Sequence, residues 1–182
     1  MRTLRLILYH LLGSWNVVGY WAVQKLMHRQ EQLNRLRQPI TEDTDILIDG
    51  PGGSGVSSLV KYVETWNPHL RIAHHNHNGY LFFRAARRGI PAICVTRNMI
   101  QSSMSLKRRF PAWNKSVVPY LRWLNVNLCA WLSNAYIVDV YDLVNDPRPL
   151  LIDIKRKHGI DLNPGNGQFP HERFPRESCE LK

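Results

Sequence analysis

A glycine-rich turn between an apolar run and a helix start constrains this chain more than any other feature. Residues 46–49 read Ile-Leu-Ile-Asp, and residues 50–58 read Gly-Pro-Gly-Gly-Ser-Gly-Val-Ser-Ser. Glycines let the backbone curl so that successive N–H groups point inward. A helix N-terminus behind such a turn adds partial positive charge that attracts anions. The segment therefore predicts a strand, a phosphate-binding loop and a helix, in that order.

The loop lacks the lysine that nucleotide hydrolases carry. Their loop follows the pattern G-x-x-x-x-G-K-[ST], and Val56 stands at the lysine position here. The sequence therefore predicts phosphate binding and argues against ATP hydrolysis. A small-molecule kinase is disfavoured for the same reason, because no loop lysine would reach the transferred phosphate.

Strand and helix signals alternate after the loop. Short apolar runs predict strands, and amphipathic periodicity predicts helices. The expected strands cover residues 45–49, 70–73, 91–96 and 135–140, and the expected helices cover residues 57–66, 80–88, 100–109, 117–133 and 149–158. This order predicts an α/β fold with a parallel sheet covered by helices on both faces.

Three regions are expected within the 182 residues. Residues 1–40 form a hydrophobic and basic helical arm, residues 44–162 form the α/β domain, and residues 163–182 form an irregular tail. Residues 6–23 are largely apolar, and a membrane-spanning helix needs about 20 such residues. A helix packed on the domain or a partner, a membrane-surface helix and a span all remain open for this segment. Residues 6–37 are thus the expected contact with a membrane surface or protein partner, and a span would leave the domain cytoplasmic.

The charge balance narrows the class of ligand. A formal net charge of +10 predicts an anionic ligand or surface. Nucleic-acid binding is disfavoured, because no recognisable motif interleaves aromatic residues with the basic runs. The three cysteines are widely spaced, which argues against a disulfide framework or a metal site.

A second motif resembles a known family. Residues 93–98 read Ile-Cys-Val-Thr-Arg-Asn, and Ser105 follows Arg97 by eight positions. This pattern is similar to the signature of sulfotransferases that use PAPS (3′-phosphoadenylyl sulfate), in which the Arg and Ser hold the 3′-phosphate of the donor. A fork-shaped guanidinium and a hydroxyl suit one phosphate group. In such sheets, ligands bind at the carboxyl ends of the strands.

Two further stretches agree with this resemblance, which covers roughly residues 45–162. Residues 52–58 are similar to the family's 5′-phosphosulfate loop, and residues 142–147 resemble the stretch before its late helix. The resemblance implies binding of PAPS, or of its product adenosine 3′,5′-bisphosphate. The implied binding residues are Gly52, Gly53, Ser54, Gly55, Val56, Ser57, Ser58, Arg97 and Ser105.

The chain also departs from the family pattern. Gly53 stands where the family often has a Lys or Arg, and Met99 replaces the usual proline. The sulfate end of the donor would then depend on backbone N–H groups and loop hydroxyls. We expect slow catalysis, or a cation borrowed from Lys107 or Arg108.

A histidine-rich segment is the expected source of the catalytic base. Residues 73–77 read Ala-His-His-Asn-His, after the second expected strand, where the family carries its catalytic histidine. His75 is the expected base, with His74 and His77 as alternatives, because histidine titrates near neutral pH. A polar surface loop is the other interpretation. A metal ion shared by His75 and His77 lacks companion ligands, so no metal site is expected.

Asp49 is the last residue of the first expected strand. We expect it to act as a structural cap, and orientation of the glycine-rich loop is the alternative role. Together the motifs predict sulfuryl transfer from PAPS to a hydroxyl or amine acceptor that the sequence does not identify. The alternative is a degenerate sulfotransferase-fold subunit with a structural or binding role in a larger, membrane-associated assembly. The missing lysine and the hydrophobic arm are the features that support this alternative.

Overall fold

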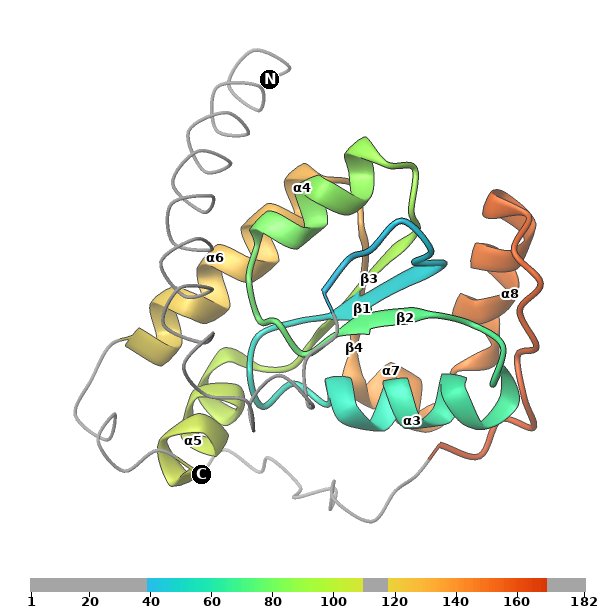
Figure 1. Cartoon of the computed structure of the whole chain (residues 1–182). Helices are drawn as coiled ribbons and strands as arrows, with labels where there is room; N and C mark the ends of the chain where they lie inside the picture. Colours follow the sequence, from blue (N-terminus) through green and yellow to red (C-terminus); the bar gives the residue numbers. More distant parts are fainter. Residues whose placement is uncertain (1–38, 110–117, 170–182) are drawn as a thin grey trace.

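The computed structural model describes residues 39–109 and 118–169. Its centre is a four-stranded sheet in which all neighbouring strands are parallel and the order is β2-β1-β3-β4 (Figure 1). The strands are β1 (Ile46–Asp49), β2 (Ile72–His74), β3 (Ala92–Thr96) and β4 (Tyr136–Asp139). The predicted α/β fold with a parallel sheet is confirmed. The helix expected within residues 1–40 lies outside the described residues.

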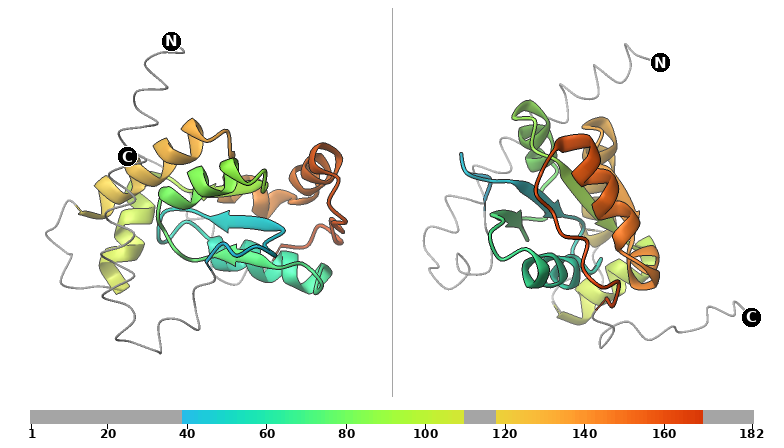
Figure 2. Two further views of the ribbon diagram at one scale, coloured as in Figure 1. Left: turned by 45° about the horizontal axis from the view of Figure 1, so that its top comes forward. Right: turned by 90° about the vertical axis from the view of Figure 1, so that its right-hand side faces the viewer.

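Six helices surround this sheet in the described part of the chain. They are α3 (Val56–Trp66), α4 (Tyr80–Arg87), α5 (Met99–Arg109), α6 (Val118–Leu132), α7 (Val140–Asn145) and α8 (Arg148–His158). Helices α3, α7 and α8 cover one face, and α4 and α6 cover the other (Figure 2). On β1, Ile46 and Ile48 enter the first core and Leu47 enters the second. Strands β1, β2 and β3 are almost wholly buried, whereas β4 lies at the edge of the sheet and is partly exposed. Apolar runs such as those of β1 and β3 are typical of parallel strands that are covered on both faces.

Helix α7 was not expected from the sequence. The stretch after the last strand begins with Asp139, whose carboxylate accepts a hydrogen bond from the backbone N–H of Tyr141 at 2.9 Å. This is an N-cap, which satisfies a donor of the first helical turn. Val140, Leu143 and Val144 then place their side chains in the core. Their i, i+3, i+4 spacing was the available signal for this helix.

The second strand lies further along the chain than expected. The sequence predicted residues 70–73, whereas β2 pairs with β1 through Ile72, Ala73 and His74. His74 is therefore the last residue of the strand rather than part of the following loop, and its side chain is buried. The shift occurs because the apolar signal of Leu70 extends before the region that pairs with β1.

The strand order creates a switch point between β1 and β3. From β1 the chain passes through α3 to β2 on one side, then crosses through α4 to β3 on the other side. In α/β sheets of this kind, ligands bind where the strand order reverses, outside the carboxyl ends of the strands. The glycine-rich loop follows β1 and Arg97 follows β3, so both lie at this position.

Helix α6 is apolar on two sides. Val126, Cys129 and Ala130 are buried in the domain. Leu121, Leu124 and Trp131 lie on the outer side, with 59%, 55% and 52% of their surfaces exposed. Within residues 39–109 and 118–169, every helix is nevertheless too short or too polar to cross a bilayer.

The first part of the expected tail packs on the domain. The Tyr62 hydroxyl donates to the carbonyl of Pro164 at 2.8 Å, and the side chain of Phe169 is buried against the same tyrosine. Residues 163–169 contain no helix or strand. Side-chain contacts with α3 therefore hold this segment in place of backbone pairing.

Candidate phosphate-binding site

The glycine-rich loop has a backbone that only glycine adopts easily. Gly53 and Gly55 have φ angles of 85° and 101°, in the left-handed region that L side chains avoid. A Cβ on Gly53 would lie 2.8 Å from the carbonyl oxygen of Ser102 on α5. The glycine is thus required both by its φ angle and by the close packing of α5 against the loop.

The N-terminus of α3 is open to an anion. Gly55 caps it without a side-chain hydrogen bond, and the first turn contains no acidic residue. The first N–H groups of a helix have no acceptor within the helix, and the helix dipole adds positive potential there. Ser57 is exposed at this turn and Ser58 is half-buried, whereas Val56 points into the core. A helix terminus with these features suits a phosphate group, which makes it the candidate binding position.

Other loop residues hold the turn itself. Ser54 is fully buried, and its hydroxyl has no hydrogen-bond partner among the described residues. The Ser102 hydroxyl donates to the carbonyl of Gly52 at 2.8 Å and fastens α5 to the loop. Ser105, expected at the 3′-phosphate, lies against Gly53, where a Cβ would come within 3.2 Å of its hydroxyl.

Asp49 joins the glycine-rich loop to the histidine segment. Its carboxylate is fully buried and accepts hydrogen bonds from the N–H groups of Gly50, Asn76 and His77, at 2.8, 3.1 and 2.9 Å. His75 and His77 have φ angles of 59° and 50°, so the segment turns twice through the left-handed region. Asp49 therefore does more than cap a strand, because it holds both loops in one arrangement.

Two of the histidine side chains contact the glycine-rich loop directly. His75 Nε2 lies 2.7 Å from the Ser57 hydroxyl, and His77 Nδ1 donates to the carbonyl of Gly50 at 2.7 Å. On its other side, the His75 Nδ1 atom contacts the Nδ1 atom of His74, so one of these two nitrogens carries the shared proton. Burial lowers the pKa of His74, which favours its neutral imidazole at pH 7. The structure thus brings His75 and Ser57 together.

Arg97 follows β3 and is oriented by residues that the sequence did not indicate. Its Nε atom donates to the Gln101 side chain at 3.1 Å, and a terminal nitrogen donates to the Tyr141 hydroxyl at 3.2 Å. That hydroxyl also donates to Gln101 at 2.9 Å. Arg97 thus donates to Gln101 and Tyr141, whereas Ser105 lies against Gly53 of the loop. Only the spacing of Gln101, one helical turn after Arg97, could have suggested part of this arrangement.

The two cations expected as substitutes for the loop lysine lie on α5. The Lys107 ammonium group is 4.8 Å from the centre of the Tyr120 ring on α6, a cation–π contact. Arg108 is exposed. Among the described residues, no group of His, Cys, Asp and Glu side chains has the arrangement of a metal site.

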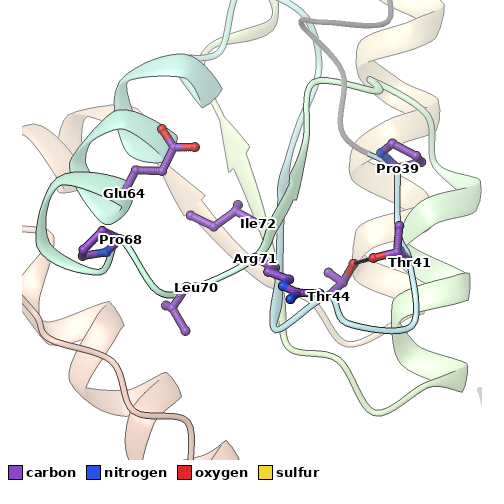
Figure 3. A pocket seen from close by; sticks show the side chains of 8 residues that line it. All are labelled: Pro39, Thr41, Thr44, Glu64, Pro68, Leu70, Arg71 and Ile72. Carbon is purple, nitrogen blue, oxygen red and sulfur yellow. Dashed lines mark hydrogen bonds between the residues drawn. The ribbon is translucent and has the colours of Figure 1, made fainter.

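A cavity of about 570 Å³ lies at the opposite edge of the sheet (Figure 3). It is lined by Pro39, Thr41, Thr44, Glu64, Pro68, Leu70, Arg71 and Ile72. The amino ends of β1 and β2 border it, whereas the glycine-rich loop follows the carboxyl end of β1. Cavity size often indicates a ligand site, but a phosphate bound by backbone N–H groups needs no deep pocket. The loop is therefore the candidate site.

Comparison of the chain with protein-family models, curated proteins and solved structures finds no match. Support for a function comes from the motifs and from the geometry of the described residues.

Proposed function

We propose that this chain binds PAPS at the glycine-rich loop and transfers its sulfuryl group to a hydroxyl or amine acceptor. The observation that carries the proposal is the 2.7 Å contact between His75 Nε2 and the Ser57 hydroxyl. It places an imidazole, which can accept a proton, beside a helix terminus suited to phosphate. Transfer of a charged group from a phosphate to an acceptor needs both features at one place.

The donor would lie across the switch point. Residues 52–58 would hold its 5′ end through backbone N–H groups and the hydroxyls of Ser57 and Ser58. Arg97 and Ser105 would hold the 3′-phosphate. The hydrogen bonds from Arg97 to Gln101 and Tyr141 involve neutral groups, so they orient the guanidinium without cancelling its charge.

The chemistry needs a base and a place for the leaving charge. The acceptor oxygen or nitrogen would form a bond to sulfur as the bond between sulfur and the bridging oxygen breaks. The acceptor proton would pass to His75, and the electron pair would remain on the 5′-phosphate of adenosine 3′,5′-bisphosphate. His75 is the proposed base because its Nε2 atom faces the loop, whereas His74 is buried.

Calorimetric titration with adenosine 3′,5′-bisphosphate tests the donor site. We expect the wild-type chain to bind it with a dissociation constant of about 1–100 μM and to bind ATP far more weakly. Arg97→Ala should reduce the affinity for the bisphosphate at least about tenfold, because it removes a charge-assisted hydrogen bond to phosphate.

Arg71→Ala is the matched control. Arg71 is exposed at the opposite edge of the sheet and pairs with Asp43, so its loss should leave affinity unchanged. Unchanged affinity in Arg97→Ala would contradict the assignment of Arg97. Failure of the wild-type chain to bind the bisphosphate would contradict the proposed function itself.

A degenerate subunit with a binding role is the second candidate. The observation that favours it is the outer side of α6, where Leu121, Leu124 and Trp131 are exposed. Ile100 and Met104 are also exposed on α5, which packs against α6. Adjacent exposed apolar side chains are typical of protein or membrane contacts. Absence of nucleotide binding, with association of the chain into larger species in sedimentation velocity, would favour this candidate.

A further inference from the structure

The glycine-rich loop itself carries no fixed positive charge for the leaving phosphate of the proposed reaction. Residues 50–58 include no charged side chain, and Gly53 and Val56 stand where related loops carry cations. Lys107 lies over the Tyr120 ring rather than in a contact with the loop. Within residues 50–58, negative charge that develops on the leaving phosphate would then meet only neutral N–H and O–H donors.

We propose that His75 supplies this charge as it takes up the acceptor proton, so that binding of the nucleotide product is linked to protonation of His75. This inference rests on the proposed function and extends it. His75 is then both the base and the cation that replaces the missing loop lysine. The two charges arise together, because the proton reaches the imidazole as the electron pair reaches the bridging oxygen.

The position of the Nε2 atom supports this dual role. It lies 2.7 Å from the hydroxyl of Ser57, which belongs to the first turn of the phosphate-binding helix. A phosphate at that helix terminus would be within reach of the same nitrogen. Neutral imidazole can accept a hydrogen bond from Ser57, whereas imidazolium can only donate. Protonation therefore turns the nitrogen from an acceptor of the serine hydroxyl into a donor toward the phosphate.

The charged and titratable groups around His75 determine the electrostatic effect of its protonation. On its own segment it faces the rings of His74 and His77, and His74 favours its neutral form because it is buried. From β1, the Asp49 carboxylate is turned toward the N–H groups of residues 76 and 77. The first turn of α3 adds no charge, and Lys61 and Glu64 lie further along that helix.

Proton uptake measured during nucleotide binding tests the inference without any assay of activity. The wild-type chain is titrated with adenosine 3′,5′-bisphosphate at pH 7.5 in two buffers of different ionisation enthalpy. We expect uptake of about one proton per nucleotide, and affinity that rises up to about tenfold for each unit of lower pH until His75 is fully protonated. The nucleotide's own phosphate titrates near pH 6, and this contribution is common to all variants.

Two variants isolate His75. His75→Gln should lose the proton uptake and bind about tenfold more weakly at pH 6.5, since a neutral donor replaces a charged one. His75→Lys should bind at least as tightly as wild type with no proton uptake near pH 7.5, because lysine is already charged. His69→Gln is the matched control, since His69 is bonded to the Asp161 carbonyl away from the loop and should behave like wild type.

The possible failures are distinct. Bisphosphate binding with no proton uptake in the wild type, or with equal uptake in wild type and His75→Gln, would overturn this inference and leave the proposed function standing. Absence of bisphosphate binding at every pH would overturn the proposed function and this inference with it. Thermal unfolding of each variant shows whether it retains the fold.

Discussion

At the scale of single residues, the Asp49 carboxylate organises the candidate site. It is fully buried at the end of β1 and accepts backbone hydrogen bonds from both the glycine-rich loop and the histidine segment. A buried charge is tolerated where several donors satisfy it. The strained φ angles of His75 and His77 are held partly by these bonds, because the N–H groups of residues 76 and 77 both point to Asp49.

Asp49→Asn should therefore destabilise the chain and loosen the histidine segment. The amide nitrogen would face N–H donors, and we expect a loss of about 2–4 kcal/mol in the free energy of unfolding, measured with urea. Asp45→Asn is the control at the other end of β1, where the carboxylate accepts one exposed bond from the Arg71 N–H. Equal losses in the two variants would contradict the organising role of Asp49.

At the scale of elements, the short helix α7 follows β4 and places a tyrosine side chain against Arg97. Asp139 caps the helix, Val140 and Leu143 anchor it in the core, and Tyr141 projects from its first turn to the guanidinium. The ring of Tyr141 also lies 5.7 Å from the centre of the Arg97 charge. The cap thus positions a residue that orients the proposed 3′-phosphate ligand.

Asp139→Ala should lower stability by about 1 kcal/mol through loss of the cap. It should also weaken bisphosphate binding, because Tyr141 would no longer hold Arg97 in place. Asp142→Ala is the matched control, since Asp142 is an exposed aspartate in the first turn of the same helix but is not its N-cap. Urea unfolding and calorimetric titration of both variants check this prediction, and it is wrong if Asp139→Ala binds the nucleotide like the control.

At the scale of the whole molecule, the parallel strands bring the residues of the candidate site to one edge of the sheet, at the carboxyl ends of the strands. The loop after β1, the histidine segment after β2 and Arg97 after β3 all emerge at the carboxyl ends of parallel strands. The cavity of about 570 Å³ occupies the other edge. Global unfolding exposes the buried titratable residues of this region, Asp49 and His74, at the same time. The free energy of unfolding therefore depends on their ionisation.

Stability should fall as the pH falls through about 6.5, the ordinary pKa of histidine. Burial lowers the pKa of His74 in the folded chain. Above pH 6.5 both states are neutral at this residue. Below pH 6.5, His74 is protonated in the unfolded chain but stays neutral in the folded chain until the pH reaches its lowered folded-state pKa. Proton binding therefore stabilises the unfolded state over this pH range. Urea unfolding at pH 7.5 and pH 5.5 measures the difference.

His74→Gln should reduce this loss of stability, and the exposed His69→Gln should not. The lowered pKa values of Asp146 and Asp153, caused by hydrogen bonds from Arg148 and Lys157, affect stability only nearer pH 4, below this window. An unchanged pH dependence in His74→Gln would show that burial of this histidine does not carry the effect.

Much of the fold could be predicted because its signals are local. The apolar run, the glycines and the serines of residues 46–58 specify a strand, a loop and a helix start through backbone preferences of neighbouring residues. Alternation of such segments then implies a parallel sheet. Helix α7 was missed although its cap and apolar spacing are also local, and β2 was placed two residues early because an apolar side chain does not show where pairing begins.

The sequence by itself determined most of the elements, the parallel α/β class and the residue types at the candidate site. Only the tertiary structure decided which of those residues meet. The His75 contact with Ser57 spans 18 positions, and the Arg97 contact with Tyr141 spans 44. Backbone preferences act over a few residues, whereas these contacts depend on strand order and on the hydrogen bonds of Asp49 and Tyr141. For that reason the sequence predicted a phosphate-binding loop and a histidine segment, and only the tertiary structure showed that the two are in contact.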